Sequence, residues 1–176
     1  VLELGDIIKK GCGWWVLKFI RELDDLILML RTNELEIGVL TIKTKGSLDN
    51  INKISKSLEA NKNNWLVNET IGLIRRTFSR LDISSRSIFT IIDNESCFGG
   101  FLSELVFCAD RSYMINNALL DNNKNGPFIS LCELNFKSLE MVNGQTRLET
   151  RFNSNIKKIK ELKTLSEQLL NTMEAY

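Results

Sequence analysis

A pair of glycines follows an apolar segment, and an acidic residue lies one helical turn beyond them. The segment 87–93 reads Ser-Ile-Phe-Thr-Ile-Ile-Asp, which predicts a buried strand because it is short, β-branched and apolar on both faces. Gly99 and Gly100 then precede a helical pattern over 101–109, so backbone N–H groups at the helix start can stabilise an oxyanion, with Glu104 on the same face as Gly100. Spacing alone favours a simpler interpretation, a tight turn followed by a glutamate near a helix start.

Acid–base chemistry in this chain has few candidate groups. The sequence has no histidine, which excludes a Ser-His-Asp or Cys-His apparatus and the commonest zinc sites. Carboxylates, lysine, tyrosine and cysteine are the remaining proton carriers. We therefore expect carboxylate chemistry, and no metal site.

The composition is that of one globular domain over 1–176. Of the 176 residues, 43% are hydrophobic and 26% are charged, close to the average for folded domains. The chain has 23 basic and 22 acidic residues, so it has no positive excess with which to bind a nucleic-acid backbone. The composition therefore argues against nucleic acid as a partner.

The cysteines and the apolar runs bear on the cellular compartment. Cys12, Cys97, Cys108 and Cys132 contain no C-x-x-C pair and have apolar neighbours, which predicts reduced, buried thiols and favours the cytoplasm. No apolar run is long enough to span a bilayer, and no targeting segment is recognisable, so no membrane partner is expected. Because the sequence begins at a valine and ends without a stop signal, we expect an internal piece of a longer protein.

Strand patterns alternate with helix patterns along the chain. This order predicts an α/β fold with a largely parallel sheet. The polar stretch 121–127 is expected to be a surface loop, and the tail is expected to form one helix over 155–173. The expected helices are 14–30, 48–58, 65–81, 101–109 and 155–173, the expected buried strands are 37–44 and 87–93, and shorter apolar segments lie at 112–115 and 128–134.

Two blocks of sequence resemble the crotonase (enoyl-CoA hydratase/isomerase) superfamily. Residues 96–110 read Ser-Cys-Phe-Gly-Gly-Phe-Leu-Ser-Glu-Leu-Val-Phe-Cys-Ala-Asp, similar to the family's glycine-rich turn, Glu-Leu pair and closing Asp. Residues 128–148 resemble its second block, in which a glutamate precedes a glycine-rich loop that ends in Arg-Leu. The resemblance implies crotonase-like β-β-α superhelix units, here truncated at both ends, and an acyl-CoA thioester as substrate.

Within the superfamily the chain is most similar to lyases that hydrolytically open the ring of an epoxidised, dearomatised benzoyl-CoA and release formate. The resemblance implies this reaction, a homodimer for the whole enzyme, and no cofactor, since coenzyme A is part of the substrate. A departure from the family pattern is Ser138-Leu139-Glu140, where the lyases tend to have Tyr-Pro. The matching stretches are 14–15, 21–25, 30–34, 96–98, 109–114, 141–144 and 147–148.

The resemblance also implies roles for individual residues. Glu104 and Glu133 correspond to the two family glutamates that position and activate water, and paired-carboxylate chemistry requires carboxylates within about 10 Å of each other. The oxyanion hole is expected at backbone N–H groups that are free and face an open pocket. Its candidates are Gly100, Phe101, Gly46 and Ser47, and the candidate substrate-pocket residues are Cys97, Phe98, Gly99, Asn143 and Gly144.

Two other functions remain open. An enoyl-CoA hydratase or isomerase reaction would use the same two glutamates. A non-catalytic interaction module, derived from the same fold, would use none of these roles and would bind a partner chain through exposed helices.

Overall fold

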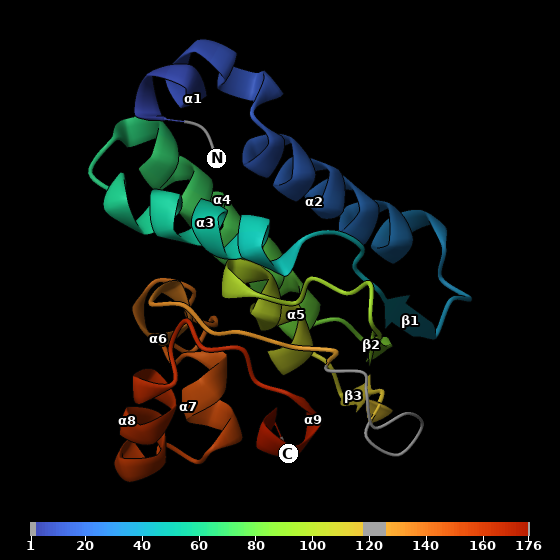
Figure 1. Ribbon diagram of the computed structural model, residues 1–176. Coiled ribbons are helices and arrows are strands. Elements are labelled where there is room, and N and C mark those ends of the chain that lie inside the picture. The colour runs from blue at the N-terminus through green and yellow to red at the C-terminus, as the bar shows by residue number, and fades with distance from the viewer. Residues whose placement is uncertain (1–2, 118–125, 176) are drawn as a thin grey trace.

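The computed structural model describes residues 3–117 and 126–175, and Figure 1 shows its arrangement. Residues 121–125 of the expected surface loop lie outside the described residues. The helices are α1 (Leu4–Lys10), α2 (Trp15–Asn33), α3 (Leu48–Ala60), α4 (Trp65–Asp82), α5 (Glu104–Phe107), α6 (Leu134–Lys137), α7 (Arg147–Arg151), α8 (Ile156–Thr164) and α9 (Thr172–Ala175). The 3-10 helices are η1 (Gly11–Gly13) and η2 (Gly100–Ser103), and the strands are β1 (Val39–Ile42), β2 (Ser87–Ile92) and β3 (Arg111–Met114).

The described strands form one parallel sheet in the order β1-β2-β3, which confirms the predicted α/β class. Helices α3 and α4 connect β1 to β2, while η2 and α5 connect β2 to β3. The expectation that 37–44 is a buried strand is wrong, because Val39 is 52% exposed and β1 alternates exposed and half-buried residues. β1 pairs only with β2 among the described strands, so it is an edge strand, and the face of β1 that carries Val39 and Thr41 is exposed.

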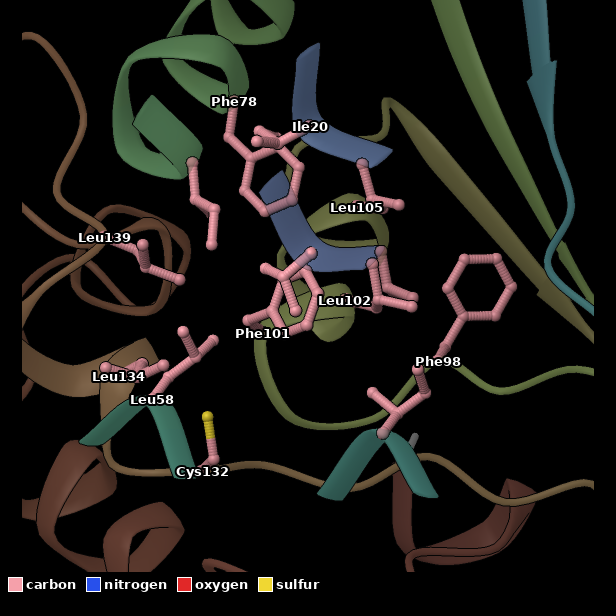
Figure 2. Close-up of a cluster of buried hydrophobic side chains, with 14 of the residues drawn as sticks. Ile20, Leu58, Phe78, Phe98, Phe101, Leu102, Leu105, Cys132, Leu134 and Leu139 are labelled. Carbon is pink, nitrogen blue, oxygen red and sulfur yellow. The ribbon is translucent and has the colours of Figure 1, made fainter. Parts of the chain in front are cut away.

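The core lies around η2 and joins helices that are far apart in the sequence. Figure 2 shows Phe101 of η2 among side chains from α2, α3, α4 and α6, including Ile20, Phe78 and Leu134. Phe78 and Phe101 are both fully buried, and burial of a side chain of this size contributes about 1.5–3 kcal/mol. The turn at 99–100 (the glycine turn) is therefore held by the packing of Phe101 as well as by its own backbone hydrogen bonds.

The expected helix over 101–109 begins as a 3-10 turn and becomes α-helical only at Glu104. The tail is not one helix over 155–173, since α8 ends at Thr164 and α9 begins at Thr172. Between them, Glu167 has φ +71°, and Leu170 pairs with Ile129 in an antiparallel bridge. These long-range backbone bonds interrupt the helical pattern.

The four cysteines are all free, but they are not all buried as expected. Cys97 and Cys132 are buried, Cys108 is partly covered, and Cys12 is exposed because it lies in the short turn η1 at the surface. Within 3–117 and 126–175, no helix has both the length and the apolar character needed to cross a membrane.

Candidate active site

The glycine turn is packed against α3, and its N–H groups are already bonded. Gly100 N donates to Ser130 O (3.1 Å), and Phe101 N donates to Ser55 Oγ (3.0 Å). Gly100 has φ +54°, and an added Cβ would overlap Ser55 Oγ. The expectation of free N–H groups facing an open pocket is therefore wrong for this structure, because Ser55 of α3 and the segment 128–132 occupy the space in front of the turn.

The second pair of expected donors lies in the turn after β1. Gly46 N donates to Glu95 O (3.1 Å), while Ser47 is the N-cap of α3 and its side chain accepts from Asn50 N. Cys97 N donates to Thr44 Oγ1 (3.0 Å). These bonds join the turn after β1, which contains Gly46, to residues 95–97, which precede the second donor pair at 100–101.

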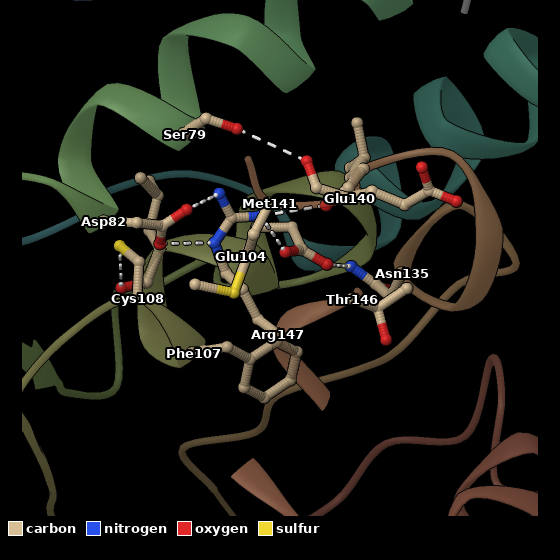
Figure 3. Close-up of polar contacts among 12 residues, drawn as sticks. Ser79, Asp82, Glu104, Phe107, Cys108, Asn135, Glu140, Met141, Thr146 and Arg147 are labelled. Carbon is tan, nitrogen blue, oxygen red and sulfur yellow. Dashed lines mark hydrogen bonds and ion pairs between the residues drawn. The ribbon is translucent and has the colours of Figure 1, made fainter. Parts of the chain in front are cut away.

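Glu104 is fully buried, and both of its carboxylate oxygens have donors (Figure 3). Asn135 Nδ2 donates to Oε1 and Arg147 Nη1 donates to Oε2, each at 2.7 Å. Burial raises the pKa of Glu104 to about 7, although the Arg147 charge and the Asn135 hydrogen bond act in the opposite direction. The carboxyl group is therefore poised to change its charge near neutral pH.

Arg147 connects Glu104 to a second buried carboxylate. Its Nε and Nη2 donate to the two carboxylate oxygens of Asp82 at 2.9 and 2.6 Å, and its Nη1 also donates to Leu139 O at 3.0 Å. The guanidinium carbon lies 5.9 Å from the centroid of the Phe78 ring. Burial is the main cause that raises the pKa of Asp82.

Local structure fixes this arginine in place. Arg147 is the first residue of α7, and Thr146 and Glu149 form a reciprocal capping box at that helix start. The sequence block that ends in Arg-Leu marked Arg147 as part of the family pattern, but the sequence did not indicate which side chains Arg147 would bind. Asp82 and Asn135 had no such signal, because each is an ordinary polar residue at the end or the start of a helix.

Glu133 has a different environment from that of Glu104. Lys137 Nζ and Lys163 Nζ lie 2.6 and 3.1 Å from Glu133 Oε1, and its side chain is 32% exposed. The hydrogen bond from Lys137 is the main cause that lowers the pKa of Glu133. Within the described chain no side chain bonds to both glutamates, so their action on one shared water stays a prediction.

The expected substrate-pocket residues fall into two separate groups. Cys97, Phe98 and Gly99 are buried beside the glycine turn, and burial raises the pKa of the Cys97 thiol. Asn143 and Gly144 lie in an exposed turn, where Asn143 Oδ1 accepts from Gln145 N. The described residues do not place these two groups around one cavity.

Among the hollows that the described residues form, three are compared with the buried network, and one of them is lined by members of that network. A cavity of about 250 Å³ is lined by Asp82, Arg147 and five neighbours at the end of α5, on α7 and in the loop before α7, and it is below the usual size of a ligand pocket. A hollow of about 750 Å³ lies between β3 and the tail, and one of about 1070 Å³ lies between α4 and the segment 137–144. Glu104 lines none of these three, so it is enclosed in this structure.

The fold and the site together define a parallel α/β domain built around a buried carboxylate–arginine–carboxylate network. No protein-family model matches the chain. The chain is 41% identical over 170 residues to benzoyl-CoA-dihydrodiol lyase from Aromatoleum evansii, an alignment that covers 97% of this chain. The chain spans 30% of the length of that protein. The predicted resemblance to this kind of lyase is thereby confirmed.

Proposed function

We propose that this chain forms part of a CoA-thioester lyase that opens the ring of 2,3-epoxy-2,3-dihydrobenzoyl-CoA and releases formate. The similarity to benzoyl-CoA-dihydrodiol lyase along 97% of the chain supports this function. In this proposal the domain consists of crotonase-like β-β-α units, the whole enzyme is a cytoplasmic homodimer, and coenzyme A enters as part of the substrate.

The ionisation of Glu104 is the structural observation that supports this function. A carboxyl group with a pKa of about 7 exists in both charge states near neutral pH, which is the property that a general acid–base catalyst needs. In its ionised form Glu104 accepts a proton from the water that attacks the ring, and in its protonated form it returns that proton to a leaving oxygen. Arg147 and Asn135 fix the direction of its two oxygens.

The proposal also assigns roles to Glu133 and to the two expected N–H donor segments. Glu133 orients a second water, and the turns at 46–47 and 100–101 supply N–H groups to the thioester oxygen. For Gly46, Gly100 and Phe101 this requires that the thioester oxygen replaces their present acceptors, which are Glu95 O, Ser130 O and Ser55 Oγ. The active form therefore differs from this structure by a shift of the glycine turn away from α3 and the 128–132 segment.

The test is Glu104→Gln in the complete enzyme that contains this chain. The amide keeps the size of the side chain but cannot exchange a proton, so we expect turnover of the epoxidised benzoyl-CoA to fall by ~10²–10⁴-fold with thioester affinity retained. Glu161→Gln is the matched control, since Glu161 pairs with Lys158 at the surface of α8, away from the proposed site. Near-normal turnover in Glu104→Gln would exclude Glu104 as the proton carrier.

A non-catalytic binding module is the second candidate function. The bonded N–H groups of the glycine turn and the enclosure of Glu104 favour it. A CoA thioester present at a hundred times its dissociation constant stabilises a protein that binds it by about 2.7 kcal/mol. An unchanged thermal midpoint with benzoyl-CoA would favour the module, whereas stabilisation together with turnover of an enoyl-CoA would indicate a hydratase-type reaction.

A further inference from the structure

Arg147 is shared unequally between two buried carboxylates. Asp82 accepts two hydrogen bonds from the guanidinium, from Nε and Nη2, while Glu104 accepts one hydrogen bond, from Nη1. The side chains of Arg147, Asp82 and Glu104 are 2%, 5% and 0% exposed. Water therefore contributes little screening among these three groups, and their charges act on one another directly.

The charges in this network do not balance. One guanidinium faces two carboxylates, so a fully ionised triad carries one uncompensated negative charge in the interior. The bidentate pair with Arg147 keeps the charge of Asp82 well compensated. Glu104, with one bond from the same arginine, is the carboxylate that more readily takes up a proton, and Asp82 opposes the ionisation of Glu104.

The other groups that face Glu104 are neutral near pH 7. Burial raises the pKa of Cys108, after α5, and of Cys132, before α6, to about 12 each. Asn135 of α6 is an uncharged donor. Asp82 of α4 and Arg147 of α7 are therefore the described charged side chains that act on Glu104.

We propose that Asp82 is a positioning residue that controls, through its hold on Arg147, the pH at which Glu104 changes charge. Its meaning for catalysis rests on the proposed function of Glu104, whereas the electrostatic link does not. Asp82 touches neither a reacting group nor Glu104 itself. It sets how much of the arginine's charge is available to the catalytic carboxylate.

The experiment is a pH titration of the Glu104 carboxyl carbon by ¹³C NMR, in the 176-residue chain labelled at glutamate. The Glu104 signal is assigned by its loss in Glu104→Gln. In Asp82→Asn the negative charge beside Arg147 is removed, and Arg147 no longer pairs with a second carboxylate. We therefore expect the titration midpoint of Glu104 to fall by roughly 1 pH unit. Asp82→Glu, which restores the charge, should return the midpoint toward the original value.

Asp24→Asn is the matched control. Asp24 also pairs with an arginine of α4, Arg80, and accepts from Thr77, but it does not belong to the Glu104 network. This variant should leave the Glu104 midpoint unchanged. If Asp82→Asn does not fold, Asp82→Ser is titrated in its place, since it also removes the charge.

An unchanged Glu104 midpoint in the folded Asp82 variant would overturn the inference. A shifted midpoint in a complete enzyme without turnover would support the electrostatic link and reject the proposed function. In an active enzyme the acidic limb of the kcat/KM profile should move to lower pH in Asp82→Asn, in parallel with the NMR midpoint. A purely structural role would lower activity at every pH without that displacement.

Discussion

At the scale of single residues, the stability of the site depends on one arginine. Removal of Arg147 leaves Asp82 and Glu104 without their cation in the interior. We expect Arg147→Met to lower the free energy of unfolding by about 3–5 kcal/mol, measured by urea denaturation at neutral pH. Arg75→Met is the control, because Arg75 is exposed on α4, and it should change stability by no more than about 0.5 kcal/mol. Equal losses in both variants would contradict a structural role for the buried network.

Glu104 also gives the folding free energy a specific pH dependence. Its pKa rises from 4.5 to about 7 on folding, so between these values the folded chain holds a proton that the unfolded chain releases. Stability from this group is therefore complete below about pH 4.5 and is lost as pH rises toward 7, by on the order of 3 kcal/mol. In Glu104→Gln the part of the decline that is due to Glu104 should be absent when denaturation is measured across the range, while the part due to Asp82, whose pKa is also raised, remains. Glu133→Gln should keep the decline, because the pKa of Glu133 is lowered on folding, so this group contributes no loss of stability as pH rises.

At the scale of elements, the start of η2 has no room for a side chain at Gly100. Gly100→Ala combines a left-handed φ of +54° with overlap on Ser55, so we expect a loss of roughly 2–4 kcal/mol in unfolding free energy. Gly144→Ala is the matched variant, since Gly144 has φ +78° with no atom within 4 Å of an added Cβ. It should cost only about 1 kcal/mol of backbone strain. Equal costs would mean that the packing of Ser55 against the turn is loose.

Local patterns were enough to predict helices α2, α3 and α4 and strand β2, whereas the catalytic role of Glu104 came from the family resemblance and stays a prediction. The helix expected over 14–30 is α2 at Trp15–Asn33, and the strand expected over 87–93 is β2, because amphipathic period and β-branched runs are local signals. The expectation that this strand is buried on both faces is wrong, since Phe89 and Ile91 on one face are only half-buried. The partners of Glu104 were not predictable in this way. Arg147 and Asp82 are hydrogen-bonded although they are 65 residues apart in the sequence. The break in the tail helix depends on the bridge between Leu170 and Ile129. Such contacts exist only in the folded chain.

At the scale of the whole molecule, the segment 129–131 links the tail to the glycine turn. On one side, Ser130 O accepts from Gly100 N and Ser130 N donates to Phe98 O. On the other side, Ile129 and Leu170 exchange two backbone hydrogen bonds of 3.0 and 2.8 Å, and Glu167 N donates to Leu131 O. The tail in the lower part of Figure 1 therefore stabilises the turn from which Glu104 begins its helix.

This link predicts a remote effect of a single tail residue. Leu170 is 5% exposed and Leu169 is 51% exposed, so Leu170→Ala should lower the unfolding free energy by about 2–5 kcal/mol and Leu169→Ala by less than about 0.5 kcal/mol. Because Leu170 fixes Ile129, the loss of its side chain should also loosen the bond between Gly100 and Ser130. Hydrogen exchange at the Gly100 amide should then be faster in Leu170→Ala than in Leu169→Ala, while amides in the middle of α2 exchange at similar rates in both. Unchanged protection of Gly100 in Leu170→Ala would show that the glycine turn is held by α3 and its own core packing, without the tail.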